Sequence, residues 1–197
     1  MSYENKLHKL VKDHRGIIKT ADALNIGITK PTLYKYLDEH KFTKVSHGIF
    51  ASPKAELDNM YVISLRSKQV VYSHDSALYL HKILANTSDR YTVTVKTGYN
   101  PSKLTAEGIK VFTIKPDLHD LGLIYVKTDT GFDVPTYNIE RTLCDVIRSR
   151  SDMDARVFQV ALRSYAKRTD RNIKLLMEYA RVFRVDKILV KYLEVLL

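Results

Sequence analysis

The strongest constraint on the fold is a pair of short helical patterns that a glycine turn separates near the start of the chain. Residues 20–24 begin at Thr20, whose hydroxyl is placed to cap a helix, and the segment NIGI at 25–28 then ends that helix. A second capping residue, Thr29, precedes Pro31, and proline is favoured at the first helical positions because its missing N–H would have no partner there. This stretch predicts a helix-turn-helix.

The second of these helices is expected to bury one face and expose the other. Leu33, Tyr36 and Leu37 fall at helical spacing and define the buried stripe. After His40 the hydrophobic pattern changes to a period of two, and a polar Ser-His-Gly tip interrupts it, which is typical of a β-hairpin. A helix-turn-helix followed by such a hairpin is a winged helix.

The rest of the chain predicts a second domain with a mixed sheet and C-terminal helices. Pro53 favours a boundary, which gives a domain at 1–52 and an α/β domain at 53–197. The pattern also predicts a first helix at residues 3–14. Strands are expected at 70–72, 91–96, 109–114, 123–126 and 132–137, and helices at 57–67, 73–84, 138–150, 154–167, 172–183 and 185–196. The expected fold class is therefore mixed α+β.

The charge balance favours a polyanionic partner. The chain has 32 Lys+Arg against 22 Asp+Glu, and the excess lies at residues 1–52 (+4) and 145–197 (+5) rather than at 53–144 (+1). Such a field attracts nucleic acid, although many basic proteins bind none. The single cysteine, the lack of a secretory signal pattern and the lack of an apolar run long enough to span a membrane lead us to expect a cytoplasmic protein.

The predicted winged helix offers a set of residues for double-stranded DNA. The N-terminal part of a recognition helix meets base edges in the major groove, and a wing contacts the backbone or the minor groove. The expected DNA-binding residues are Lys30, Thr32, Tyr34 and Lys35 on the helix and Lys44, Ser46 and His47 on the hairpin. Winged helices also serve as protein-binding modules, in which case these side chains form a solvated surface.

The segment SHDSALYLH at 73–81 places Ser, His and Asp together without the geometry of a catalytic relay. Adjacent helical residues point in different directions, so His74, Asp75 and Ser76 do not align for nucleophilic chemistry. His74 and His81 lie two turns apart, roughly 10 Å along the helix, which is too far for a shared metal. We expect structural histidines here, with no metal and no cofactor.

Two further features lie towards the C-terminus. Arg141 and Asp145 are one turn apart and favour an ion pair within a helix, and Cys144 is expected to be a small buried residue. The sequence also predicts a possible second basic surface, made of Arg148, Arg150, Arg163, Lys167 and Arg168. These side chains either lie on solvent-exposed helix faces or bind a second stretch of DNA or an acidic partner.

Six strings in this order resemble the AbiEi family, the antitoxins of type IV toxin–antitoxin systems that act in abortive infection against phage. They are RGIIKTADALNIGITKPTLYKYL with the hairpin KVSHGIFASP, then VVYSHDSALYLHKIL, YTVTVKTGYN, and YNIERTLCDVIRSR followed by ALRSYAK. The more specific signs are SHDSALYLH at 73–81 and ERTLCD at 140–145, and the resemblance covers nearly the whole chain.

The resemblance implies a non-enzymatic protein with two roles. The winged helix would repress the protein's own operon by binding inverted repeats. The domain from about Lys54 onward would counter a nucleotidyltransferase-type toxin without a stable complex.

Two other classes of function stay open on the residues alone. One is a hydrolase or nuclease that uses His74, Asp75 and His81, for which the sequence lacks paired carboxylates or compact metal-ligand spacing. The other is a ligand-responsive winged-helix repressor without an antitoxin role, whose second domain senses a small molecule.

Overall fold

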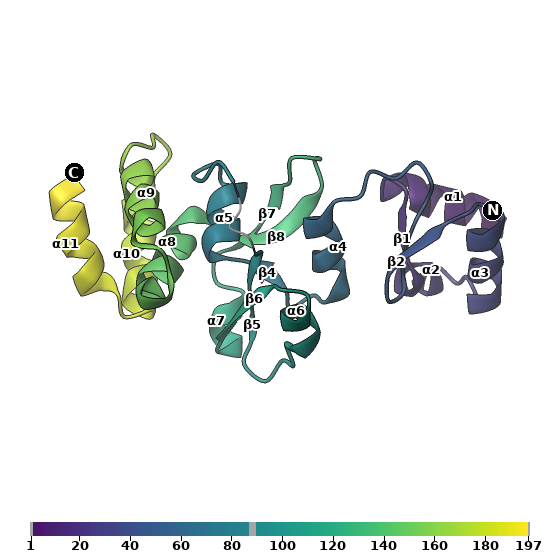
Figure 1. Cartoon of the computed structure of the whole chain (residues 1–197), viewed down its shortest axis with the longest axis horizontal. Helices are drawn as coiled ribbons and strands as arrows, with labels where there is room; N and C mark the ends of the chain where they lie inside the picture. Colours follow the sequence, from purple (N-terminus) through teal and green to yellow (C-terminus); the bar gives the residue numbers. More distant parts are fainter. Residues whose placement is uncertain (1, 87–89, 197) are drawn as a thin grey trace. The chain divides into compact units, whose positions relative to one another are not determined.

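The structure, a computed structural model that describes residues 2–86 and 90–196, divides into two compact units. They are Met1–Lys68 and Gln69–Leu197 (Figure 1). The division therefore falls after Lys68, not at the boundary of 52/53 that Pro53 suggested. The reason is that the helix following Pro53 folds with the first unit, where the hydroxyl of Tyr61 lies 3.3 Å from Nδ1 of His14.

The first unit combines four helices with a small antiparallel sheet. Its elements are α1 (Tyr3–Asp13), β1 (Ile17–Lys19), α2 (Thr20–Asn25), α3 (Lys30–Glu39), β2 (Thr43–Ser46), β3 (Ile49–Ala51) and α4 (Asn59–Arg66). The sheet has the order β1-β3-β2, so the expected hairpin gains a third strand. That strand was not predicted, because three residues are too few to show a period.

The two expected helix caps have different outcomes. Thr29 caps α3 as predicted, since its hydroxyl accepts the backbone N–H of Thr32 at 3.4 Å. The cap predicted at Thr20 is wrong: Thr20 is the first residue inside α2, and Lys19 takes the N-cap position. The hairpin explains the change, because the carbonyl of Gly48 accepts the Thr20 N–H at 2.8 Å.

The core of the first unit is built on the predicted stripe of α3. Leu33, Tyr36 and Leu37 are buried, and they pack with Leu7 of α1 and Ile28 of the turn between α2 and α3. Burial of these side chains fixes which face of α3 points to solvent.

The second unit is a five-stranded mixed sheet with helices. Its elements are β4 (Val71–Tyr72), α5 (His74–Leu80), β5 (Thr92–Lys96), α6 (Ser102–Ala106), β6 (Lys110–Ile114), α7 (Pro116–His119), β7 (Leu123–Lys127), β8 (Asp133–Tyr137), α8 (Ile139–Arg148), a 3-10 helix (Arg150–Asp152), α9 (Ala155–Ala166), α10 (Ile173–Val182) and α11 (Asp186–Leu196). The strand order is β6-β5-β4-β8-β7, with parallel pairs β5–β6 and β4–β8. The mixed α+β fold class is confirmed.

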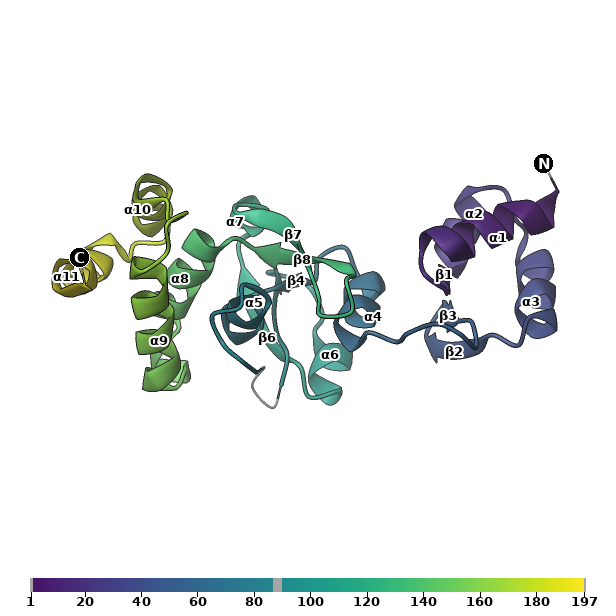
Figure 2. The same cartoon turned by 90° about the horizontal axis from the view of Figure 1, so that it is seen from above.

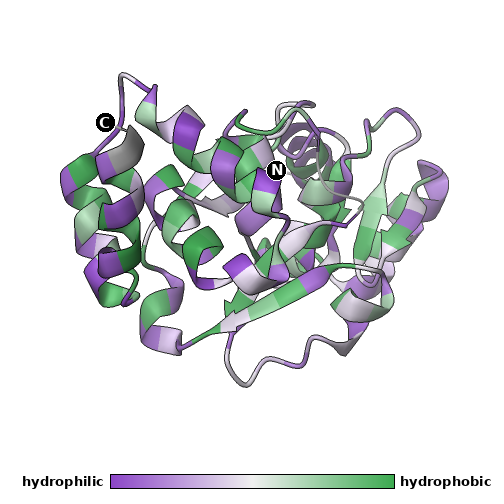
Figure 3. Cartoon of the chain, turned by 60° about the vertical axis from the view of Figure 1, so that its left-hand side comes forward, coloured by the Kyte–Doolittle hydropathy of each residue, from purple (hydrophilic) through white to green (hydrophobic). Residues whose placement is uncertain are grey.

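Helix α8 lies at the centre of the second unit. Residues Ile139–Ile147 are all buried, and α8 packs against α5, α9 and α10 (Figure 2). Figure 3 shows hydrophobic and hydrophilic residues alternating along the helices, the striped pattern of amphipathic elements. Because α8 is buried on every side, its polar residues need partners within the protein.

Arg141 of α8 satisfies this requirement with several hydrogen bonds. Its Nε donates to Oδ2 of Asp145 at 3.0 Å, as the one-turn spacing predicted. Its Nη1 donates to the carbonyls of Leu118 and Leu121, at 2.9 and 2.8 Å. This fully buried guanidinium therefore ties α8 to the chain around α7.

No helix among residues 2–86 and 90–196 has the length and the apolar character needed to cross a membrane.

The close approach of Gly122 to Arg141 gives a stability prediction. A Cβ at Gly122 would lie 2.7 Å from Cβ of Arg141, and the residue has φ +78°, so Gly122→Ala combines a clash with backbone strain. Gly98 is the matched control, because it has φ +93° but no atom within 4 Å of an added Cβ. We expect Gly122→Ala to lower the free energy of unfolding, measured by urea denaturation, by about 1–3 kcal/mol more than Gly98→Ala. Equal losses in the two variants would contradict a close fit at Arg141.

Candidate functional site

The face of α3 opposite its buried stripe carries three exposed side chains of the expected DNA-binding set. Lys30, Tyr34 and Lys35 are exposed, and the ring of Tyr34 keeps 49% of its surface in solvent. Lys35 approaches Glu39 one turn on, with Nζ 3.8 Å from the carboxylate and both side chains largely exposed. Such a surface pair contributes little, so the Lys35 ammonium can exchange the carboxylate for a phosphate or a base edge.

Thr32 differs from these three residues because it supports the helix start. It is half-buried, and its hydroxyl lies 2.9 Å from the hydroxyl of Thr29, the residue that caps α3. Its methyl and hydroxyl groups are thus less accessible than the sequence suggested.

The hairpin adds two more exposed side chains, and its position relative to α3 is fixed by an aromatic contact. Lys44 and His47 are exposed, whereas Ser46 is half-buried beside a bulge where the register of β2 shifts. The ring of Phe50 in β3 meets Tyr34 edge to face, with centroids 5.9 Å apart. The expected helix and wing residues therefore come from neighbouring elements of one unit.

Two lysines that sequence reasoning did not select lie beside the turn between α2 and α3. A surface hollow of about 320 Å³ is lined by Lys6, Lys9, Leu10 and Asp13 of α1 together with Ile26 of the turn between α2 and α3. Nζ of Lys6 donates to the carbonyl of Ile26 at 3.4 Å. In the sequence, the only indication of this pair is that the two lysines are three residues apart and so share a face of α1. That spacing becomes informative only when the structure shows that this face meets the turn.

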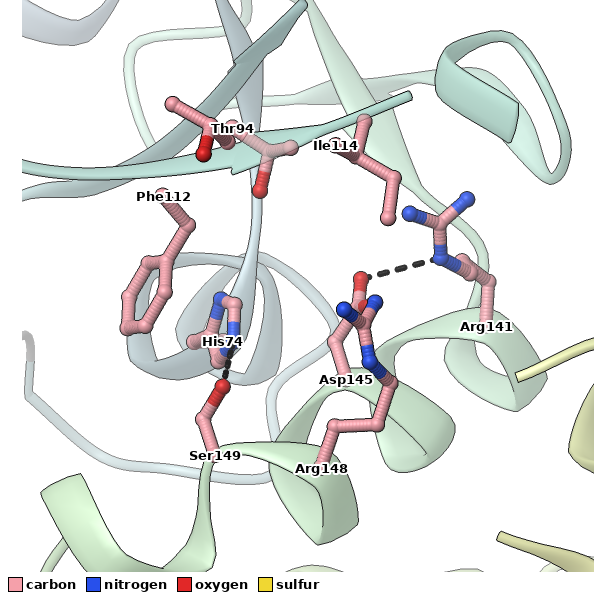
Figure 4. A pocket seen from close by; sticks show the side chains of 9 residues that line it. His74, Thr94, Phe112, Ile114, Arg141, Asp145, Arg148 and Ser149 are labelled. Atoms are coloured by element: carbon pink, nitrogen blue, oxygen red, sulfur yellow. Dashed lines mark hydrogen bonds and ion pairs between the residues drawn. The ribbon is translucent and has the colours of Figure 1, made fainter. Parts of the chain in front are cut away.

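A second candidate region is a buried polar pocket in the larger unit (Figure 4). His74 lies in it with 3% of its surface exposed, and its ring stacks on Phe112 with centroids 3.7 Å apart. Nδ1 lies 3.0 Å from the hydroxyl of Ser73, and Nε2 lies 3.1 Å from that of Ser149. His74 also has φ +48°, a strained conformation for a residue other than glycine.

The charged side of this pocket comes from α8. Asp145 lies between Arg141 and Arg148, whose Nη1 is 3.6 Å from the Asp145 carboxylate. Burial raises the pKa of Asp145, and the two arginines oppose this shift. Nη2 of Arg141 has no hydrogen-bond partner within the described parts of the chain. The cavity measures about 30 Å³, the size of one water molecule.

The imidazole of His74 pairs with two serine hydroxyls in this pocket but is a weak base. Burial, reinforced by the positive charges of Lys110 and Arg141, lowers the pKa of His74 to about 3, so its ring is neutral. The hydroxyl of Ser76 instead accepts the backbone N–H of Thr92 at 2.8 Å. His81 lies with Nε2 2.8 Å from the carbonyl of Tyr137. These contacts tie α5 and its C-cap to β5 and β8.

The second basic surface is more heterogeneous than its sequence suggests. Arg148 faces the pocket beside Asp145, and Arg168 forms two hydrogen bonds to Asp170. Nη1 of Arg150 donates to the carbonyl of Ile147 at 3.0 Å. Arg163 and Lys167, both on or next to the end of α9, are exposed. Part of the predicted charge is thus already paired within the protein.

Cys144 is buried, as predicted. Burial raises the pKa of its thiol to about 12, so the thiolate needed for nucleophilic or redox chemistry is suppressed.

No protein-family model and no curated protein matches the sequence. Among solved structures, the crystal structure of the RV2827C protein from Mycobacterium tuberculosis is similar to this chain. Its TM-score is 0.59 at 13% sequence identity, and the match covers 91% of this chain and 71% of the other. At this identity the likeness establishes a shared fold.

The buried neutral histidine predicts a pH dependence of stability. An unfolded histidine binds a proton near pH 6.5, whereas folded His74 stays neutral down to about pH 3. Stability from His74 is therefore complete above about pH 6.5 and falls as the pH decreases, by up to roughly 1.4 kcal/mol per pH unit.

His74→Gln should make this acid-side slope shallower. Urea denaturation of both proteins between about pH 7 and 4.5 measures it. The raised pKa of Asp145 acts in the opposite direction but is common to both proteins. Equal slopes would show that His74 does not titrate in this way.

Proposed function

We propose that this chain is a DNA-binding repressor of its own operon and the antitoxin of a type IV toxin–antitoxin pair, as its resemblance to the AbiEi family implies. The first unit would be a winged helix, with α3 as the recognition helix and the β2–β3 hairpin as the wing. The helix–strand–helix–helix–strand–strand order of residues 3–51 supports this assignment.

The observation that carries the DNA-binding half is the two-sided character of α3. One face is buried through Leu33 and Leu37, and the other exposes Lys30, Tyr34 and Lys35 next to the hairpin. A helix held this way can enter a major groove with its cationic and aromatic side chains facing the base edges. The lysines of α1 beside the turn add phosphate contacts to the proposed interface.

The antitoxin half is supported by the way the two most specific strings meet. His74 belongs to the first, SHDSALYLH at 73–81, and Arg141 and Asp145 belong to the second, ERTLCD at 140–145; all three residues line the same pocket. The pocket therefore unites the residues that carry the resemblance. In this proposal it supports the second unit, which counters a nucleotidyltransferase-type toxin encoded in the same operon.

The alternative of a ligand-responsive repressor receives less support from the same pocket. Its volume of about 30 Å³ is far below the roughly 300 Å³ or more of a typical small-molecule site.

DNA binding is tested by fluorescence anisotropy with duplex DNA from upstream of the protein's own operon. We expect Lys35→Ala to weaken binding by about 1–3 kcal/mol and to relax the preference at one or two base positions, because a base contact is lost. Lys54→Ala is the matched control, since it removes an exposed lysine outside the proposed interface. Its affinity should stay near that of the original protein.

Affinity should also fall steeply between low and moderate salt, because phosphate contacts release counterions. Salt-independent binding, or equal affinity for random duplex, would refute the DNA-binding proposal.

The division of labour is tested by co-expressing the chain with the toxin from the same operon. A Lys30→Ala, Lys35→Ala double variant should lose repression of an operon-promoter reporter, because both cations of the α3 face are gone, yet should still rescue growth. Lys54→Ala, which removes an exposed lysine outside the proposed interface, is the control and should keep both repression and growth rescue. Loss of growth rescue in the double variant at normal protein levels would show that the two roles are not separable.

A further inference from the structure

A cluster of potential metal ligands lies at the junction of α1 and α3, away from the exposed DNA-facing side chains of α3. Glu4, His8 and His40 each offer one ligand atom, and these atoms all lie within 4.8 Å of one another. Glu4 and His8 are one turn apart on α1, and His40 is the C-cap of α3. The cluster therefore joins two helices that are separate in sequence.

The orientation of His40 suits metal binding. Its Nδ1 lies 3.0 Å from the carbonyl of Tyr36 and its ring stacks on Tyr36 with centroids 4.1 Å apart. A histidine that donates Nδ1–H to a carbonyl keeps Nε2 as a free acceptor, which is the usual second-shell arrangement of a metal-bound histidine.

The partner histidine is close enough to share an ion with His40. The rings of His8 and His40 have centroids 5.3 Å apart at 83°. The carboxylate of Glu4 lies within 4.8 Å of the ligand nitrogens of both histidines. Tetrahedral ligands 2.0–2.1 Å from Zn²⁺ are about 3.4 Å apart, so rotations of exposed side chains suffice to close the site.

We propose that Glu4, His8 and His40 bind a divalent transition-metal ion of the Zn²⁺ type. Two imidazoles and one carboxylate are a known zinc ligand set, with water or another donor at the fourth position. Mg²⁺ and Ca²⁺ prefer all-oxygen ligands and are disfavoured here. The bound ion cross-links α1 to the C-terminal end of α3.

The competing explanation needs no metal. Glu4 lies in the first turn of α1, where a carboxylate stabilises the helix dipole, and the two histidines pack around Tyr36 as rings. The two explanations differ in one measurable respect, because only the metal site makes ion binding depend on all three side chains.

The test is a titration of the full-length, tag-free and chelator-treated protein with Co²⁺, followed by visible absorption, with Zn²⁺ as competitor. One equivalent of Co²⁺ should bind, and Zn²⁺ should displace it. His8→Ala and Glu4→Gln should each weaken Co²⁺ binding by about 100-fold or more, since changes of second-shell residues alone cost 10–100-fold. Glu4→Gln is the safer variant for folding, because Glu4 is exposed.

His14→Ala is the matched control, because it removes an imidazole close to the end of the same helix and should leave Co²⁺ affinity unchanged. Equal Co²⁺ affinity in Glu4→Gln, His8→Ala and the original protein would overturn the site. Equal weakening in His14→Ala would overturn it as well.

One consequence rests on the proposed function, in which α3 enters DNA. Zn²⁺ should then raise operator affinity in the original protein and not in Glu4→Gln. The Co²⁺ titration contains no DNA, so a failure of the metal site is distinguished from a failure of DNA binding.

Discussion

The larger unit depends on one buried cation. Arg141 is fully buried, yet its guanidinium donates hydrogen bonds to Asp145 and to two carbonyls. Its Cζ lies 4.0 Å from the ring centroid of Tyr137 and 4.2 Å from that of Phe183. Removing one partner of a buried pair costs about 3–5 kcal/mol, because the other charge is left without compensation. These contacts hold α8 to the chain around α7 and to Tyr137 of β8, and Arg141 and Asp145 also line the polar pocket around His74.

The smaller unit depends on a different constraint, the separation of the two faces of α3. Its buried face is aliphatic and aromatic, and its exposed face is cationic and aromatic. Tyr34 belongs to the exposed face but also touches Phe50 of the hairpin, so the surface proposed to read DNA is anchored from within the unit. The same helix ends at His40, where the proposed metal ligands gather. The buried stripe of α3 therefore holds in place both the surface proposed to bind DNA and the proposed metal ligands at the end of the helix.

Sequence reasoning succeeded where local signals are strong. The cap at Thr29, the stripe from Leu33 to Leu37 and the five strands of the larger sheet follow from capping and periodicity. It failed where long-range contacts determine the local structure, as in β1, which forms because β3 pairs with it. It also missed α6 and α7, because these helices are too short to show a hydrophobic period. The Glu4–His8–His40 cluster was missed for the same reason, since no spacing in the sequence brings His40 to α1.

The pairing pattern of the larger sheet also sets an order of assembly during synthesis. The central strand β4, at Val71–Tyr72, pairs in parallel with β8 at Asp133–Tyr137, so that sheet cannot close until about 65 further residues have been made. The strand pairs of the smaller unit, β1–β3 and β2–β3, all lie within Met1–Lys68. Because domains generally fold as units from the N-terminus during synthesis, we expect the N-terminal unit to fold before the sheet of the larger unit is complete.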